Sequence, residues 1–532
     1  MRSTPKRLIV ALAASCAFVI FYLTWSAGED RSSFSFRDHN DAVLKGRRQA
    51  IEGAFQHAWD GYSEHCMGHD SLHPVSNTCD DDFGGWGATA IDTLSTAILF
   101  EKEDIVRQIM IFISKLDFAK VTGGSSIQLF EVTIRHFGSM LSAHDLLHGP
   151  FSHLVNDKTL RESLYTQMVS LGAALSCGFS TPSGIPRNWV DPTKCATDDG
   201  QSNTVAGAGS LILEFAKLSE ITGHQLYVEL AKRAEQHLVD PHPVEMMPWP
   251  GVLGSFVRVA DGQLMDMKGS WGSLADSFYE YLLKAYIYDS KAYAPYLERW
   301  KLAADSTIRY IASHPYGQPQ YTFLPYWEGK KLFNAMDSLS WFAGGNFIQG
   351  GMITNNQTLI DFGLSIADTG GAMYQMTATG LGGEFVVWTD DCNDGFREQF
   401  HLEDCHANNS IQITGAEFKL RPEVIESWYY AYRATKNPKY REWAWSAYRA
   451  IERVCKTGSG FSAISDVNAP NGGKKLDQME SFVFAEIFKY LWLMHLPDHN
   501  ADFHMQDSRT GEHNTWVLNT EAHLFKVAGP PV

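Results

Sequence analysis

Basic residues are the minority among the charged side chains of this 532-residue chain. It has 44 Lys and Arg against 61 Asp and Glu, which gives a formal net charge of −17. Nucleic acids and anionic membrane surfaces are themselves negative, so an acidic chain is a poor partner for either. We therefore expect no nucleic-acid partner, and membrane contact only through a dedicated anchor.

Zinc-type cysteine spacing and interdomain linkers are missing as well. None of the eight cysteines belongs to a CxxC pair, so the cysteines give no sign of a zinc site. From residue 46 onward no long Gly-, Ser- or Pro-rich segment divides the chain. The length prior of about 150 residues per domain would suggest three or four domains. The absence of linkers instead favours one large domain.

One long apolar run lies near the N-terminus. Residues 8–25 carry no charge and follow three basic residues, which predicts a signal anchor with the bulk of the chain in the lumen. A cleaved signal peptide is the alternative, because "WSAG" offers small residues for cleavage, but the bulky end of the run favours the anchor. We therefore expect a cytosolic tail over 1–7, a stalk over 26–45 and the large domain over 46–532.

Cysteines and glycosylation sequons fit a lumenal location. Asn356 and Asn408 each begin an Asn-x-Ser/Thr sequon. Short spacing in loop-like sequence suggests disulfides, although connectivity cannot be read from sequence. The locally spaced pairs are Cys66/Cys79, Cys177/Cys195 and Cys392/Cys405, with Cys455 left over.

Helical periodicity dominates the large domain. Apolar residues recur three and four positions apart in segments such as 103–116 and 440–455, and glycine-rich turns such as 121–126 separate such segments. Helix pairs joined by turns predict a toroid or solenoid of helical hairpins. No repeat of fixed length is visible, so periodicity leaves open whether the array is a closed αα-barrel.

Charged residues recur at the starts of these apolar helices. Taken singly, each pair is typical of a helix start, where acidic groups complement the helix dipole or pair along one face. Taken together, they predict several buried carboxylates in one pocket, some kept ionised by arginines. A glycosidase uses two such carboxyls, one to protonate the leaving oxygen and one to activate water, although a sugar-binding lectin could have the same lining. The pairs are Glu131/Arg135, Asp276/Glu280, Glu423/Glu426 and Glu480/Glu486.

Six stretches in order make the chain recognisable. They read "GGWGATAIDTLSTAILF", "FEVTIRHFGSMLSAHDLL", "GSLADSFYEYLLK", "LRPEVIESWYYAYR", "DQMESFVFAEIFKYLWL" and "NTEAHLF". Together they resemble motifs of the class I α-1,2-mannosidases, glycoside hydrolase family 47, and most closely the Golgi and secreted fungal members. The resemblance implies an all-α fold, an (αα)7 barrel of seven helical hairpins with small loop and hairpin elements, and a bound Ca²⁺ at its base. It also implies inverting hydrolysis of terminal α-1,2-linked mannose from high-mannose N-glycans.

The resemblance assigns roles residue by residue. Glu131 matches the general acid, Glu423 the general base and Asp276 a third essential carboxylate. Inversion needs room for a water, so the acid and base carboxyls should lie roughly 6.5–9.5 Å apart. Arg135 and Arg421 are expected to orient the carboxylates, and Thr520 matches the calcium ligand through its hydroxyl and carbonyl oxygens. The other matched positions are Phe482, expected to stack under the mannose, and Glu426, Glu486 and Glu521, expected to hold its hydroxyls or the metal's waters.

Three positions depart from the family pattern. Trp341 and Gly370 stand where most members carry a disulfide, and we expect Trp341 to offset part of that loss by packing. Leu274 replaces the arginine of the endoplasmic-reticulum trimming enzymes, which implies broader, Golgi-type trimming. Ser338 replaces a histidine beside the subsite for the cleaved sugar.

The leading interpretation is a calcium-dependent mannosidase of the Golgi or endoplasmic-reticulum membrane. It would have a lumenal catalytic domain acting as a monomer, and a secreted form is compatible with it. Ser338 and the missing disulfide motivate an alternative, a mannosidase-like lectin of glycoprotein quality control with little turnover. A purely structural helical scaffold is disfavoured, because it gives no reason for so many carboxylates at helix starts.

Overall fold

The computed structural model describes residues 41–122, 124, 126–391, 406, 409–498 and 513–532. The expected tail, the anchor and most of the stalk lie outside these ranges. So do Cys392, Cys405 and the sequon asparagine Asn408. No helix within the described ranges is long and apolar enough to cross a membrane.

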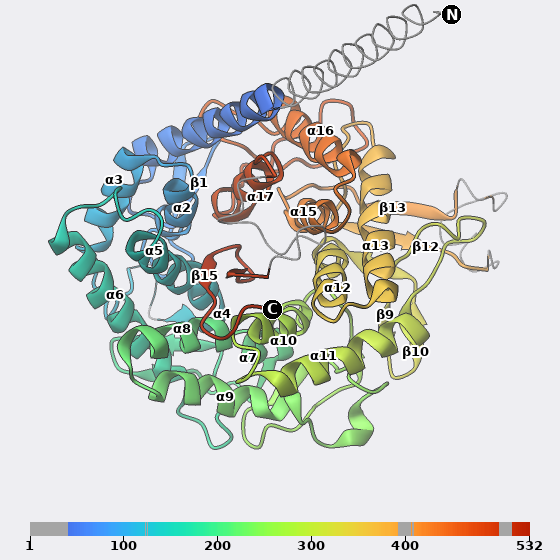
Figure 1. The fold of residues 1–532 in the computed structure, drawn as a ribbon, viewed down its shortest axis with the longest axis horizontal. Coiled ribbons are helices and arrows are strands. Elements are labelled where there is room, and N and C mark those ends of the chain that lie inside the picture. The colour runs from blue at the N-terminus through green and yellow to red at the C-terminus, as the bar shows by residue number, and fades with distance from the viewer. Residues whose placement is uncertain (1–40, 123, 125, 392–405, 407–408, 499–512) are drawn as a thin grey trace, which may run out of the picture.

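Two concentric rings of helices form the molecule, with seven helices of the described chain in each (Figure 1). The outer ring consists of residues 41–65, α3 (Glu103–Ile113), α6 (Lys158–Ser176), α9 (Leu226–Val239), α11 (Ala294–Ser306), α13 (Gln357–Gln375) and α16 (Pro438–Val454). The inner ring consists of α2 (Ala88–Leu99), α5 (Gly138–His148), α8 (Ile212–Thr222), α10 (Asp276–Tyr288), α12 (Phe342–Ile353), α15 (Glu423–Thr435) and α17 (Phe488–Met494). Outer and inner helices alternate along the chain, so each successive pair is a hairpin. The predicted (αα)7 barrel is confirmed.

The ring closes between its first and last inner helices. Thr96 of α2 donates from Oγ1 to the backbone oxygen of Phe484 at 2.8 Å, across 388 positions of sequence. Phe484 belongs to η7 (Val483–Ile487), a π-helical turn that leads into α17. A closed barrel, rather than an open array, is therefore the architecture.

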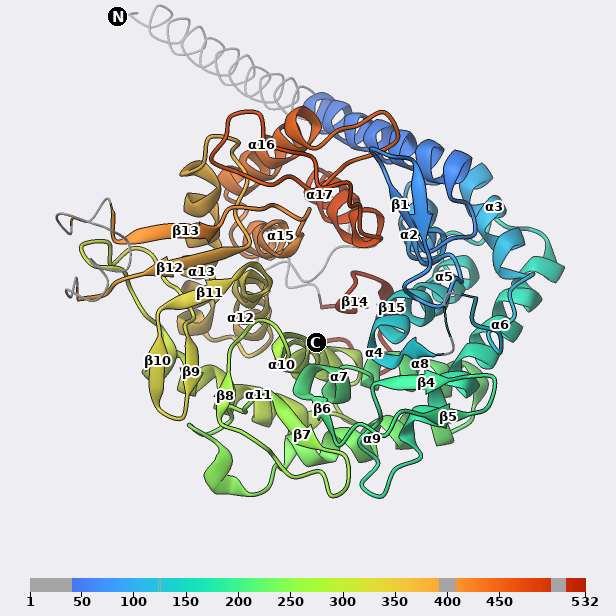
Figure 2. The same ribbon diagram turned by 180° about the vertical axis from the view of Figure 1, so that it is seen from behind.

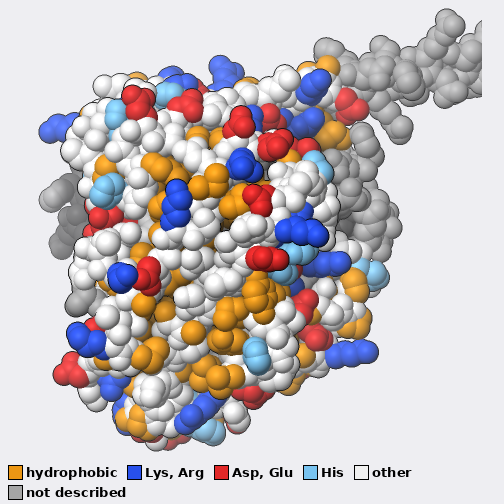
Figure 3. Space-filling model, turned by 90° about the vertical axis from the view of Figure 1, so that its left-hand side faces the viewer, with side chains coloured by type: hydrophobic (Ala, Val, Ile, Leu, Met, Phe, Trp, Pro, Cys, Tyr) orange, Lys and Arg blue, Asp and Glu red, His pale blue; other side chains and the backbone are white. Residues whose placement is uncertain are grey.

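Burial explains which helices lie inside. All twelve residues of α2 are buried, as expected for a helix with neighbours on every side. In α3 the buried positions form one stripe: Ile105, Val106, Ile109, Met110 and Ile113. Figure 3 shows charged and hydrophobic side chains interspersed on one side of the outer wall. The helix over 41–65 already includes the last five residues of the expected stalk, and Leu44 within them is buried.

Short antiparallel sheets connect the helices, and Figure 2 shows several of them in front of the rings at one end of the barrel. Five sheets lie between helices: β1 (Ser71–His73) with β2 (Thr78–Asp80); β3 (Ile127–Gln128), β4 (Trp189–Asp191) and β5 (Ala196–Thr197); β6 (Ser202–Thr204) with β7 (Phe256–Arg258); β8 (Lys268–Gly269), β9 (Tyr326–Glu328) and β10 (Lys331–Phe333); β11 (Ala335–Asp337), β12 (Phe385–Trp388) and β13 (Ile411–Gly415). Short 3-10 and π-helical turns fill the remaining connections: η2 (Cys177–Phe179), η3 (Val244–Met246), η4 (Thr307–Ile311) and η5 (Ser338–Trp341).

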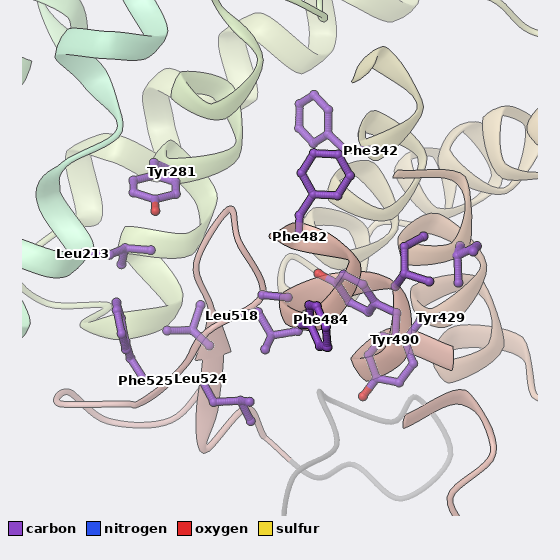
Figure 4. Packing of buried hydrophobic residues seen from close by; sticks show 14 of the residues in the cluster. Leu213, Tyr281, Phe342, Tyr429, Phe482, Phe484, Tyr490, Leu518, Leu524 and Phe525 are labelled. Carbon is purple, nitrogen blue, oxygen red and sulfur yellow. The ribbon is translucent and has the colours of Figure 1, made fainter. Parts of the chain in front are cut away.

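The C-terminal hairpin fills the middle of the barrel. Strands β14 (Trp516–Leu518) and β15 (Leu524–Lys526) pair with Val517 opposite Phe525, and both residues are fully buried. Figure 4 shows Leu518 and Leu524 of this hairpin between side chains of the surrounding helices. The hairpin therefore closes the barrel from within, and its turn is held against the inner helices.

Two of the predicted disulfides are present, Cys66–Cys79 and Cys177–Cys195. Cys455 is free and buried, and the third predicted pair lies outside the described residues. Asn356 of the first sequon is exposed and caps α13, accepting from the Thr358 backbone N at 3.0 Å.

Trp341 packs closely at the two positions where the family resemblance led us to expect the loss of a disulfide. Trp341 is 4% exposed, and a Cβ built on Gly370 would lie 3.4 Å from its ring atom Cε3. On its other side the Trp341 ring lies 5.8 Å from that of Phe323, centroid to centroid. The ring therefore occupies the space between η5 and α13, as expected from the sequence.

Candidate active site

The predicted catalytic carboxyls lie at the starts of inner helices. Glu131 is in α4 (Leu129–Val132), which continues through η1 (Thr133–Phe137) into α5. Asp276 and Glu423 are the first residues of α10 and α15. Because outer and inner helices alternate, the inner helices all run in one direction and their starts gather at one end of the barrel. Their positive dipole ends favour carboxylates there.

Arg135 joins several carboxylates into one cluster. Its Nε and Nη2 contact Glu131 Oε2 at 3.0 and 2.9 Å, while Nη1 donates to Glu521 Oε1 and lies 3.8 Å from Asp92. Nη1 also donates to Ser481 Oγ at 3.2 Å. Burial opposes the charged form, but the carboxylates outweigh it and raise the pKa of Arg135 well above its ordinary value. The guanidinium thus stays charged and opposes the effect of burial on the Glu521 carboxyl.

Arg421 forms a second cluster with a carboxylate that the sequence analysis did not identify. Its Nε donates to Glu384 Oε2 at 3.2 Å, and the Lys419 backbone N donates to Glu384 Oε1 at 3.1 Å. The same Oε2 accepts from Ser338 Oγ at 3.3 Å. Glu384 therefore connects Arg421 to the position where the family pattern has a histidine.

Phe482 lies between the two arginines. Its ring centroid is 5.8 Å from Cζ of Arg135 and 5.7 Å from Cζ of Arg421, within the range of cation–π contact. The side chain is 5% exposed and directly precedes η7. An apolar face flanked by charged groups is the kind of surface on which a sugar ring can rest.

Asp276 and Glu423 have strongly raised pKa values. Burial is the main cause for both, and it raises each pKa to about 8. For Asp276 the charges of Asp337 and Glu280 add to the shift, while the Ser277 backbone N, at 2.9 Å, opposes it. For Glu423 the Arg421 charge opposes burial, yet Oε2 is buried without a hydrogen-bond partner among the described residues.

Further carboxyls lie deeper in the barrel. Burial raises the pKa of Glu426 to about 8, against the opposing charge of Lys284 at 3.9 Å, and Glu426 Oε1 accepts from Tyr490 Oη at 3.1 Å. Burial also raises the pKa of Glu486 and of Glu521 well above the ordinary range. At this floor of the barrel the cations Lys284, Lys489 and Arg135 lie beside the carboxyls, but burial still raises the pKa of all three carboxyls.

The turn of the C-terminal hairpin presents Thr520 and Glu521 to this floor. Asn519 Oδ1 accepts from the backbone N of Glu521 at 3.0 Å and of His523 at 2.8 Å. Asn519 Nδ2 donates to the backbone oxygen of Ile134 at 3.0 Å, which ties the turn to η1. Thr520, held by its N–H to Tyr281 Oη at 3.3 Å, remains partly exposed.

This arrangement fits a hard cation bound mainly through neutral oxygens. No group of three or more His, Cys, Asp or Glu in the described ranges is placed to hold a metal directly. Ca²⁺, however, takes six to eight oxygens and accepts hydroxyls, carbonyls and waters. The hydroxyl and carbonyl oxygens of Thr520, with the nearby buried carboxyls to hold waters, supply that type of donor.

Sequence comparison decides the family. Residues 54–527 match glycosyl hydrolase family 47. The chain belongs to this family. It is 42% identical over 489 residues to a protein of Aspergillus niger named as a probable mannosyl-oligosaccharide alpha-1,2-mannosidase 1B, covering 92% of this chain and 93% of the relative. It is also 42% identical, over 99% of both chains, to a mannosyl-oligosaccharide alpha-1,2-mannosidase of Coccidioides posadasii. Among solved structures, an alpha-1,2-mannosidase from Trichoderma reesei superposes with a TM-score of 0.86 at 40% identity, covering 91% of this chain and 99% of that one.

Leu274 stands apart from the buried family 47 cluster. It lies two residues before Asp276, is 42% exposed and has a φ of 79°. Its carbonyl oxygen accepts from the Ala206 backbone N at 2.8 Å, which ties the strained backbone to α7 (Val205–Gly209). A longer side chain at this position would extend into solvent without displacing the core.

Ser338 borders a small cavity behind the family 47 site. The cavity has a volume of about 20 Å³ and is lined by Ser338, Glu384, Arg421 and Glu423, together with Trp341 and apolar neighbours. A cavity needs roughly 10–15 Å³ to hold a water, so this one has room for about one. Serine at position 338 therefore leaves room for about one water beside Glu384.

Proposed function

We propose that this chain hydrolyses terminal α-1,2-linked mannose from high-mannose N-glycans, with inversion at the anomeric carbon. Support comes from the relatives, which are 40–42% identical over nearly the whole chain and are named as α-1,2-mannosidases. The observation that carries the proposal is the set of carboxyls that Arg135 and Arg421 gather on both sides of Phe482. The relatives reported above lend no support to the lectin alternative.

In the proposed mechanism Glu131 donates a proton to the glycosidic oxygen as its bond to the anomeric carbon breaks. Water attacks that carbon from the opposite face, and Glu423 takes the proton that the water releases. Asp276 is the third carboxyl beside the reacting sugar. Arg135 and Arg421 orient Glu131 and Glu384, and the Phe482 ring supports the terminal mannose.

A bound cation would favour the ionised form of Glu423, which is the form that acts as a base. With a pKa of about 8 in the metal-free chain, most of its carboxyl is protonated at pH 7. Bound Ca²⁺ would supply positive charge and coordination positions for sugar hydroxyls. We propose that Thr520 holds it through its hydroxyl and carbonyl oxygens, with Glu426, Glu486 and Glu521 orienting its waters.

We further propose that the enzyme works as a monomer in the secretory pathway. Residues 8–25 would hold it in the Golgi or endoplasmic-reticulum membrane, with the barrel in the lumen. The two disulfides and the exposed sequon at Asn356 support an oxidising, glycosylating compartment.

Incubation with a high-mannose N-glycan tests the activity. We expect free mannose and successively trimmed glycans in the presence of Ca²⁺, little product in EDTA, and β-mannose as the first anomer seen by proton NMR. A folded, calcium-loaded chain that releases no mannose would overturn the proposal. Release of α-mannose first would overturn inversion alone.

A further inference from the structure

A groove on the outer wall of the barrel lies far from the chemistry described above. It has a volume of about 890 Å³ and lies between α11 and the loop that follows α9. The helices α9 and α11 are neighbours in the outer ring (Figure 1). Its lining includes Val244, Met247, Arg299 and Leu302. The volume falls within the range of about 300–1,000 Å³ that is usual for small-molecule sites.

Arg299 is a buried cation in this groove, and no described residue forms an ion pair with it. The residue is 5% exposed, and its Nε is buried with no hydrogen-bond partner in the part of the chain that the structure describes. Nη1 and Nη2 reach only the sulfur of Met247, at 3.5 and 3.6 Å. A thioether is a weak acceptor, so it satisfies a guanidinium poorly. Burial lowers the pKa of Arg299 to about 10, which still leaves it charged at neutral pH.

Other charges at the groove lie at its rim. Glu298 is 69% exposed at its side chain and paired with Lys301 at 2.7 Å, so this pair is neutral overall. The Asp240 side chain is 82% exposed, and its carboxylate lies 3.9 Å from His242. Charges this well solvated interact weakly across water, so they do not replace a direct partner for Arg299.

Hydrophobic side chains cover the approach to the guanidinium. Val244 is 56% exposed and Leu302 is 49% exposed, and both line the groove. Met247 lies over the guanidinium and is only partly buried, and its unbranched side chain can change rotamer to admit a better acceptor. The groove thus combines a buried, positively charged guanidinium with an apolar entrance.

We propose that this groove binds an aliphatic carboxylate, with the carboxylate on the Arg299 guanidinium and the hydrocarbon chain along Val244 and Leu302. The two oxygens of a carboxylate match the planar guanidinium fork, and such bidentate pairs are strong when desolvated. The site is separate from the glycosidase centre, because Arg299 belongs to an outer helix. The ligand supplies a direct anionic partner, which the described residues do not place on this guanidinium.

Calorimetric titration of the full chain with octanoate tests the site. We expect saturable binding of octanoate by the wild-type chain. Octan-1-ol, which lacks the carboxylate, and inorganic phosphate, which lacks the hydrocarbon chain, should each bind at least about tenfold more weakly. Arg299→Met should weaken octanoate binding at least about tenfold, the effect of losing a charge-assisted hydrogen-bonded pair. The matched control is Arg309→Met, at an exposed arginine paired with Asp305, which should bind like wild type.

A second variant keeps the proposal testable if Arg299→Met fails to fold. Leu302→Asp places a negative charge at the exposed rim, so it should weaken octanoate binding by repulsion while leaving the core intact. Mannose release from N-glycans should be unchanged in Arg299→Met, Leu302→Asp and Arg309→Met. Absence of octanoate binding by wild type, or undiminished binding by both Arg299→Met and Leu302→Asp, would overturn the proposal. Phosphate binding as tight as octanoate would do so too.

Discussion

Glu131 and Glu423 both lie at the starts of inner helices, but the two carboxyls differ in the hydrogen-bond partners that surround them. Glu131 is held by Arg135 at 2.9–3.0 Å, so its carboxyl has a fixed hydrogen-bonding partner. Glu423 has Arg421 nearby, yet one of its oxygens is buried without a hydrogen-bond partner among the described residues, and its pKa is raised to about 8. Position at a helix start therefore does not by itself set the environment of a carboxyl, which depends on burial and on the partners that the fold places beside it.

Removing the Glu423 carboxylate should have the largest effect. Glu423→Gln keeps the shape but cannot accept the proton of water, so kcat for mannose release should fall by about 10²–10⁴-fold. The melting temperature should not fall, because the neutral amide avoids burying a carboxylate. The control is Glu442→Gln, at an exposed glutamate paired with Arg47 on the outer surface, which should leave kcat unchanged. Retention of more than about a tenth of wild-type kcat would contradict the role of Glu423 as base.

Calcium removal should make the stability of the fold depend on pH, through the raised pKa values of its buried carboxyls. The pKa values of Asp276, Glu423 and Glu426 are raised from 3.8, 4.5 and 4.5 to about 8 in the metal-free fold. Between about pH 4 and pH 8 the folded chain therefore binds more protons than the unfolded chain, and its free energy of unfolding falls as the pH rises. We expect the melting temperature in EDTA to be lower at pH 8 than at pH 5.5.

Added Ca²⁺ should reverse most of that loss, and by more at pH 8 than at pH 5.5, because binding favours the ionised carboxyls. Melting curves at the two pH values, each with EDTA or with Ca²⁺, measure both effects. Mg²⁺ serves as the control, since its small octahedral shell suits this set of oxygens less well. A calcium effect of equal size at both pH values would contradict the explanation.

The sequence predicted the charged helix starts because local rules place them. Glu131 and Arg135 lie four apart on one helix, so their contact follows from helix geometry. Glu384 was missed because it lies directly before a short strand, β12, and meets Arg421 only in the folded molecule. Asp92 was missed because it lies inside the fully buried helix α2, where a single charged residue gives no pattern. Asn519 gave no signal either, since its importance comes from the turn that it fixes.

The architecture was predictable as hairpins but not as a closed ring. Apolar periodicity reports one helix and its neighbours, whereas closure depends on contacts such as Thr96 with Phe484, far apart in sequence. The barrel was predicted only through the resemblance to family 47. The groove at Arg299 could not be predicted at all, because a lone arginine on a helix reads as an ordinary surface residue.

Leu274→Arg should change which glycan branches reach Glu131 and Glu423, and it should leave the hydrolysis reaction itself unchanged. Leu274 already has a positive φ and is 42% exposed, so arginine would add no backbone strain beyond that of leucine and no buried charge. Its donors should hold one glycan branch and obstruct the others, narrowing the products toward removal of a single mannose. Chromatography of the trimmed glycans over time measures the change. An unchanged product profile would remove the basis for a Golgi-type assignment.

Of the changes considered, Ser338→His should have the smallest effect on activity. It tests the surroundings of Arg421, the arginine near Glu423. Ser338 Oγ lies 3.3 Å from Glu384 Oε2, which also accepts from Arg421, and the adjoining cavity of about 20 Å³ has room for about one water. A bridging water can be nearly as favourable as a direct contact, so the wild-type chain should be active. Histidine would displace that water and reach a sugar hydroxyl or the Glu384 carboxylate directly.

Ser338→His should lower the activation free energy by the amount expected for one polar contact that is stronger in the transition state. At about 1–2 kcal/mol, it should raise kcat/KM for mannose release about 5- to 30-fold. A histidine beside Glu384 would also titrate near neutral pH, so the pH profile of kcat/KM should shift, which serine cannot cause. Ser338→Asn is the matched control, since it offers hydrogen bonds without a titrating group and should raise kcat/KM without moving the profile. If Ser338→His changes neither kcat/KM nor its pH profile, the gap beside Ser338 is neutral for catalysis.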